Sequence, residues 1–143
     1  MAITQGMANS FKVQLLSGTQ NFNSDTFKLA LYTSSATLGE TTTAYTTSGE
    51  CASTGNYTAG GNDLTVSVTP TNTGNVAYIS FANTSWTNAT ITANGALIYN
   101  STRANAAVAI LAFGGDKTST NGTFAVNFPT ADASTAIIRL TAS

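Results

Sequence analysis

The sequence predicts an all-β protein, either an antiparallel β-sandwich or a jelly roll, with a short N-terminal helix. Short segments in which apolar and polar residues alternate recur along the 143 residues, as expected for strands with one buried face. Turns rich in Gly, Asn and Pro separate these segments, which is typical of sandwiches. A chain of this length corresponds to about one domain and can bury a core.

The chain is divided at residue 10. Residues 1–10 carry no strong pattern and are interpreted as an N-terminal arm, because chain ends order only when something holds them. Residues 11–143 are expected to form a single β domain. No repeat or linker divides this region.

A short helix is predicted over residues 7–17. Met7, Phe11 and Leu15 lie four positions apart, and Gly18 stands where a helix commonly ends. The helix is expected to close one end of the β core with its apolar side. A strand is the alternative, because apolar residues also alternate within this segment.

The clearest strand pattern is Asp25–Thr33, in which Phe27, Leu29 and Leu31 share one face. The polar region Ser34–Ala59 follows and is interpreted as a loop, with a possible short strand near Tyr45–Cys51. Further strands are predicted where alternation returns between turn residues, at Leu64–Thr69, Val76–Phe81, Thr123–Phe128 and Ile137–Leu140. Pro70 is expected to end the first of these, and Pro129 the third.

The most apolar stretch, Gly95–Gly115, predicts a central β-hairpin. Its arms are Ala96–Tyr99 and Ala107–Phe113, and the second is expected to end at Gly114–Asp116. This second arm is apolar on both faces, so both faces should be covered. The preceding polar segment, Ala82–Asn94, contains the single Trp, which is expected in the core, with an exposed interface anchor as the alternative.

The composition is unusual in its low charge. Charged residues make up 8% of the chain, against about 25% in a typical soluble domain. Thr, Ser and Asn take their place, and neutral hydroxyls and amides cost less to bury than ions. Such a surface suits a protein assembled against other proteins, although compositional drift or a salty habitat would also explain it.

Several classes of function are disfavoured. The net charge is −1 and the cations are scattered, whereas nucleic-acid binding needs clustered Lys and Arg. No apolar run approaches the roughly 20 residues of a membrane helix, and residues 1–12 do not resemble a signal peptide. These observations therefore predict that the protein binds neither nucleic acid nor a membrane.

No catalytic, cofactor-binding or metal-binding residues are predicted. The chain has no His and one Cys, so Ser/His/Asp and Cys/His sets are excluded. Cys51 stands beside an acidic residue, which disfavours a reactive thiol. The acids Glu40, Glu50 and Asp63 fall in polar regions where carboxylates are normally solvated, and the oxygen donors near Asp63 and Asp116 are too few for calcium.

Four segments carry a resemblance to a known group of proteins. They are MANSFKVQLLSG (7–18), DTFKLALYTSSATLGETTTAYTTSGE (25–50), NYTAGGNDLTV (56–66) and GALIYNSTRANAAVAILAFGGDKT (95–118). The chain resembles small virion structural proteins of tailed bacteriophages. The resemblance implies a non-enzymatic building block, made in the host cytoplasm and incorporated into the virion. Met1–Gly6 extends beyond the shared pattern.

Three hypotheses follow. The first is a capsid decoration (cement) protein, present as a homo-dimer or homo-trimer, that binds the major capsid protein on the outer head lattice. The second is a tail or fibre component that contacts the host surface; under this hypothesis Tyr32, Tyr45, Tyr57 and Trp86 would be exposed and would be the candidate contacts. The third, a small hydrolase, has no residue set to support it. Contacts are expected in the arm, in Ser34–Ala59 and around Trp86.

Overall fold

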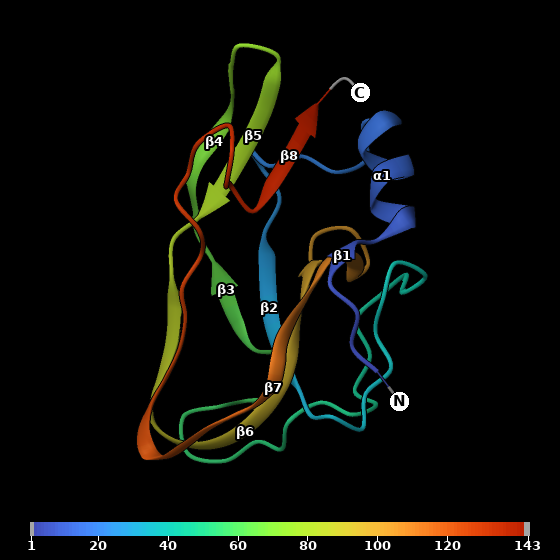
Figure 1. The fold of residues 1–143 in the computed structure, drawn as a ribbon. Helices are drawn as coiled ribbons and strands as arrows, with labels where there is room; N and C mark the ends of the chain where they lie inside the picture. Colours follow the sequence, from blue (N-terminus) through green and yellow to red (C-terminus); the bar gives the residue numbers. More distant parts are fainter. Residues whose placement is uncertain (1, 142–143) are drawn as a thin grey trace.

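Two antiparallel sheets and one short helix make up the computed structural model, which describes residues 2–141 (Figure 1). One sheet has the strand order β1–β7–β6–β2–β3 and the other the order β4–β5–β8. The elements are β1 (Gly6–Met7), α1 (Asn9–Leu16), β2 (Phe27–Tyr32), β3 (Asn62–Leu64), β4 (Val66–Thr73), β5 (Val76–Phe81), β6 (Thr84–Asn100), β7 (Ala106–Val126) and β8 (Ile138–Thr141). The all-β, sandwich-like prediction with one short helix is confirmed, and the jelly-roll alternative stays a prediction.

The two sheets meet through aromatic rings. Phe27 of β2 stacks on Phe22, with ring centroids 4.6 Å apart, and both rings contact Phe81 of β5. Phe11 of α1 meets the same cluster edge-on, at 6.0 Å from Phe22. The helix therefore closes this end of the core, as its apolar spacing predicted.

The most apolar stretch does form the centre of the larger sheet. Its first arm pairs with β2 from Gly95 to Asn100 and with β7 on the other side. Ala107, Val108 and Ile110 of the second arm are completely buried. The prediction that this arm is covered on both faces is confirmed for its first half, while Leu111 and Phe113 are half-buried.

The hairpin continues far beyond its predicted ends. The structure contradicts the expectation that β7 ends at Gly114–Asp116, because β7 runs for 21 residues and pairs with the 17 residues of β6. The glycines lie instead in a bulge between the Ala93–Lys117 and Gly95–Ala112 pairs. A bulge bends a strand pair, and the ribbon curves at the foot of the molecule and returns towards the small sheet (Figure 1).

Pro70 does not end its strand. β4 extends from Val66 to Thr73, and the pairing with β5 shifts register between Val68 and Thr71. Because β4 is an edge strand, a residue without an N–H is tolerated at such an irregularity. In place of the short strand considered near Tyr45–Cys51 there are two isolated bridges, one at Ala44, just before this segment, and one at Glu50, within it.

The described part of the predicted N-terminal arm, residues 2–10, lies against the domain. Gly6 and Met7 pair with β7 as β1. Before β1 the chain turns away to Leu38, which exchanges backbone hydrogen bonds with Ala2 and Thr4. The arm thus crosses from the sheet edge to the long loop and leads directly into α1.

Candidate interaction surfaces

The outer side of α1 is apolar and exposed. Phe11 is buried, but Val13 is 67% and Leu16 is 90% exposed. These two residues are three positions apart and so share one side of the helix. The sequence predicted the helix and its inner side, but not that its outer side would also be apolar.

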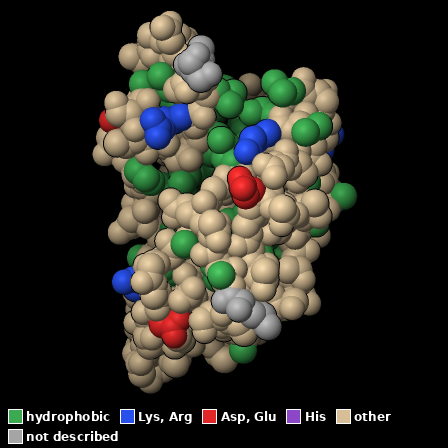
Figure 2. Space-filling model, turned by 45° about the vertical axis from the view of Figure 1, so that its right-hand side comes forward, with side chains coloured by type: hydrophobic (Ala, Val, Ile, Leu, Met, Phe, Trp, Pro, Cys, Tyr) green, Lys and Arg blue, Asp and Glu red, His purple; other side chains and the backbone are tan. Residues whose placement is uncertain are grey.

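The small sheet also exposes apolar side chains on the side that faces α1. Ile79 and Ile138 form a buried pair across β5 and β8, whereas the next pair on the same face is Ala77 and Leu140, and Leu140 is 47% exposed. A hollow of about 110 Å³ lies here, and hydrophobic side chains gather between the small sheet and the helix (Figure 2). We call this region the α1 surface; it comprises Val13, Leu15, Leu16, Phe22, Pro70, Ala77, Tyr78, Ile79, Ile138 and Leu140.

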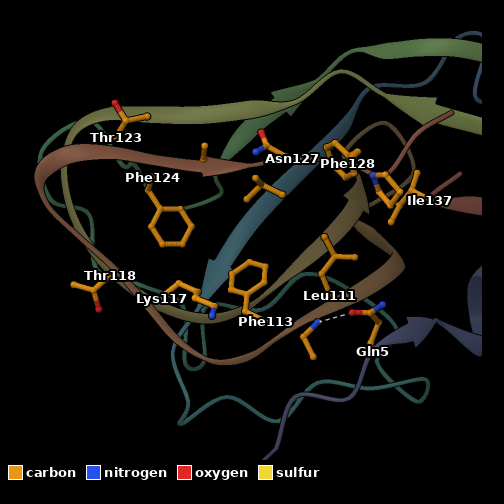
Figure 3. A pocket seen from close by; sticks show the side chains of 14 residues that line it. Gln5, Leu111, Phe113, Lys117, Thr118, Thr123, Phe124, Asn127, Phe128 and Ile137 are labelled. Atoms are coloured by element: carbon orange, nitrogen blue, oxygen red, sulfur yellow. Dashed lines mark hydrogen bonds between the residues drawn. The ribbon is translucent and has the colours of Figure 1, made fainter. Parts of the chain in front are cut away.

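A second candidate surface lies inside the curve of β7. The side chains of Leu111 and Phe113, before the bulge, face those of Phe124 and Phe128, after it, across an open groove of about 550 Å³ (Figure 3). The rings of Phe113 and Phe124 lie 6.2 Å apart. We call this the β7 groove; its lining is Gln5, Leu111, Ala112, Phe113, Lys117, Thr118, Thr123, Phe124, Ala125, Val126, Asn127, Phe128, Pro129 and Ile137.

Two polar side chains mark the ends of the β7 groove. Lys117 is its one charged lining residue, and no ion pair of this lysine is present among residues 2–141. At the other end, the backbone N–H of Ala112 donates to Oε1 of Gln5 at 3.2 Å (Figure 3). A side chain thus takes the acceptor position that a neighbouring strand would supply.

The four aromatic residues that the tail or fibre hypothesis requires at the surface are not fully exposed. Tyr32, Tyr57 and Trp86 are each no more than 2% exposed, and Tyr45 is half-buried. This contradicts their predicted role as surface contacts and confirms the core placement of Trp86, which lies within β6 against Tyr57 and Phe124. The polar sequence around Trp86 hid this position, because the neighbouring polar residues belong to the opposite face of a strand rather than to a loop.

Glu50 is not the solvated loop carboxylate that the sequence indicated. It is half-buried and accepts hydrogen bonds from the hydroxyl of Tyr45 at 2.5 Å, from the hydroxyl of Tyr57 at 2.7 Å and from the backbone N–H of Gly60 at 2.6 Å. The Tyr57 oxygen in turn accepts from the Leu31 N–H at 2.9 Å. These contacts tie the long loop to β2, so Glu50 holds the loop in place.

Charge and burial make this cluster chemically quiet. Burial, together with the negative charge of Glu50, raises the pKa of Tyr57 and of Tyr45. The same two causes raise the pKa of Cys51 to about 11, and its thiol donates to the Thr92 carbonyl. Burial and a raised pKa both disfavour the thiolate form of Cys51 at neutral pH.

The remaining candidate acids are separated. Glu40 and Asp63 are exposed, and Asp63 pairs with Lys28 at 3.0 Å on the neighbouring strand. Asp116 accepts a hydrogen bond from Asn94 across the bulge. Within residues 2–141 no group of three or more His, Cys, Asp or Glu side chains could hold a metal ion, and none of the helices there could span a membrane.

Comparisons with known proteins add no relative. No protein-family model, no curated protein and no solved structure matches this chain. The functional argument therefore rests on the sequence resemblance, the fold and these surfaces.

Proposed function

We propose that this chain is a virion structural protein of a tailed bacteriophage, and specifically a capsid decoration protein that binds the major capsid protein on the outer head lattice. In this proposal it is made in the host cytoplasm and acts in the virion as a homo-dimer or homo-trimer. The location in the virion rests on the sequence resemblance. The observation that carries the binding role is the α1 surface.

The α1 surface has the chemistry of a protein-binding site. Leu140 lines the hollow and is 47% exposed, and Leu16, next in sequence to the lining residue Leu15, is 90% exposed. Contiguous exposed apolar patches are uncommon on monomeric proteins and mark contacts. The elements that carry this surface, α1, β4, β5 and β8, contain two charged residues, Lys12 and Arg139, so a partner can cover it while desolvating few ions.

A decoration protein can work with modest contacts. Each copy would bury the α1 surface against a lattice subunit, and self-association would place several such surfaces on one oligomer. Linked contacts raise the overall affinity by factors of about 10² to 10⁴ without any new interaction type. A small, nearly neutral domain is sufficient for this task.

The deciding measurement is the position and copy number of the protein in the virion, by cryo-electron microscopy and quantitative mass spectrometry. We expect a copy number comparable with that of the major capsid protein, and density on the outer head. About a dozen copies or fewer, confined to the tail, would contradict the head assignment. This result would favour the alternative, a tail or fibre component, although the aromatic contacts predicted for that role are buried.

A variant tests the α1 surface itself. Leu16→Glu places a charge on a side chain that is 90% exposed, so folding should be unaffected while attachment to particles lacking the protein is lost. Thr87→Glu, at an exposed position of β6, is the matched control and should attach normally. Equal attachment of both variants would exclude the α1 surface as the lattice contact.

A further inference from the structure

We propose that the β7 groove binds an extended, apolar peptide segment of another protein, which adds as a strand to the free edge of β7 and places an acidic side chain beside Lys117. This site is separate from the α1 surface. Its occupant is defined by the backbone, the apolar lining and the single charge of the groove.

The edge of β7 is open where the groove begins. β6 pairs with one side of β7 from Ala106 to Val126, with interruptions at the register shifts, but on the other side β1 pairs only with Ala109 and Ile110. Among the described strands, none pairs with this second edge from Leu111 onwards. An unpaired edge presents backbone donors and acceptors at strand spacing, which an extended chain satisfies.

Gln5 shows that this edge accepts a partner. The Ala112 N–H bonds to the Gln5 side chain, at the point where the N-terminal segment leaves the sheet for Leu38. An incoming strand would replace the Gln5 amide oxygen by its own carbonyl oxygen. The exchange conserves the hydrogen bond at Ala112, so the partner strand can enter without leaving this N–H unpaired.

The side chains of the groove select an apolar segment. Leu111 and Phe113 alternate with Ala112 on β7, and Phe124 and Phe128 form the facing wall (Figure 3). In an added strand, alternate side chains point to the same face, so every second residue of the segment would enter the groove. An apolar chain of about eight residues is long enough to use the edge and both walls.

The positive charge of Lys117 favours a peptide with an acidic residue at the end that lies beside this lysine. Lys117 is the only charged lining residue, and the structure pairs it with no carboxylate among residues 2–141. The neighbouring carboxylate of Asp116 accepts a hydrogen bond from Asn94 instead. An Asp or Glu of the peptide would meet an uncompensated cation, whereas a Lys there would meet like charge.

The test uses the full chain and an array of ten-residue peptides. The peptides alternate apolar and hydroxyl residues and carry Glu, Gln or Lys at one end. Binding of the best peptides is then titrated in solution by intrinsic fluorescence, because Trp86 is the single tryptophan and its ring lies 6.4 Å from that of Phe124, which lines the groove.

Three results are expected. Glu-terminated peptides bind more tightly than their Lys counterparts, and Lys117→Glu reverses this preference, weakening the Glu peptides by about tenfold. Lys12→Glu, at an exposed position of α1, leaves both affinities unchanged. N-methylation of alternate peptide amides on the bonding edge abolishes binding while keeping every side chain.

The proposal is overturned if no peptide on the array binds above background, if Lys117→Glu does not alter the charge preference, or if N-methylated peptides bind as well as their parents. The third outcome would indicate a side-chain pocket instead of an added strand. Because the assay uses the purified chain, its result does not depend on where the protein sits in a virion.

Discussion

The β6–β7 hairpin has an inner half and an outer half, which differ in how many faces of the strand pair are buried. In the inner half, Gly95–Asn100 is buried throughout, on both faces. In the outer half, Thr84–Asn94 and Lys117–Val126, one face is buried and the other carries Thr, Ser and Asn. The first half is a core strand pair, and the second is a half-exposed ribbon that shapes the β7 groove.

The difference shows how a polar segment can still be structural. The outer half buries Trp86, Ile91 and Phe124, and its buried Ser119 donates to the Ala89 carbonyl at 2.8 Å. Buried polar groups are tolerated when they are paired in this way. The polar face is thus the exterior of a strand pair, although its composition resembles a loop.

The largest expected effect tests whether the outer half belongs to the cooperative core. Trp86→Ala should lower the free energy of unfolding by about 3–5 kcal/mol, the usual range for deleting a buried Trp. Urea denaturation followed by circular dichroism measures the change. Trp86→Phe is the matched control: it keeps most of the volume and removes a buried indole N–H that has no partner among residues 2–141. A Trp86→Ala cost below about 1 kcal/mol, against that usual range, would mean that the outer half is a detachable loop.

The inner half gives the next largest effect. Ile110 is completely buried, and Ile110→Ala should cost about 2–5 kcal/mol, because deletion removes apolar contacts and leaves a cavity. Leu16→Ala deletes an apolar group that is 90% exposed and should change stability by less than about 0.5 kcal/mol. Thermal unfolding at equal concentrations compares the two variants, and similar melting temperatures would show that Ile110 is not in the core.

The contrast also explains what the sequence could predict. The inner half was recognised because both faces are apolar. In the outer half, register shifts between Trp86 and Ala89 and between Ala89 and Ile91 break the period of two. Asn88 has a left-handed φ of 49° at the first shift, a conformation that Asn tolerates. Each register shift interrupts the alternation of apolar and polar residues, so the sequence of the outer half does not indicate a strand.

The candidate surfaces were harder to predict than the strands. Alternation predicted a strand over Thr123–Phe128, but it did not indicate that Phe124 and Phe128 would face Leu111 and Phe113, because this arrangement depends on the bend of β7. Likewise, the apolar residues of α1 were visible in the sequence, but the pattern did not indicate that Leu16 would be 90% exposed. Local patterns predict faces, whereas tertiary geometry decides which faces stay uncovered.

A smaller effect is expected where the two halves join. Gly114 has a φ of +78°, and a Cβ added there would meet nothing within 4 Å. Gly114→Ala should therefore cost about 1–2 kcal/mol from backbone strain alone, and Gly114→Asn should cost less because Asn accepts this conformation. Chemical denaturation of the three proteins provides the measurement. An unchanged stability in Gly114→Ala would mean that the bend does not need the left-handed residue.

The smallest effect concerns the closed end of the inner half, where Asp25 holds the turn between β6 and β7. Its side chain is 2% exposed and accepts hydrogen bonds from Arg103 Nε at 3.0 Å, Asn100 Nδ2 at 2.8 Å and the Asn21 N–H at 3.1 Å. Burial by itself would raise the pKa of Asp25, but the hydrogen bonds and the Arg103 charge outweigh it and lower the pKa.

A lowered folded-state pKa means that Asp25 stabilises the fold above its unfolded pKa of about 3.9, and that this contribution is lost as the pH falls through the folded value. Asp25→Asn should therefore be less stable than wild type at pH 6, and the difference should shrink towards pH 2. Urea denaturation across this range measures the difference.

Asp132→Asn is the control. It removes another carboxyl whose pKa is lowered, by hydrogen bonds from Thr135 and Ser134, at a site far from the turn in sequence. It therefore corrects for general effects of acid on stability. A wild-type and Asp25→Asn difference that stays constant with pH would show that the Asp25 contacts tie the turn down sterically, without a contribution from its charge.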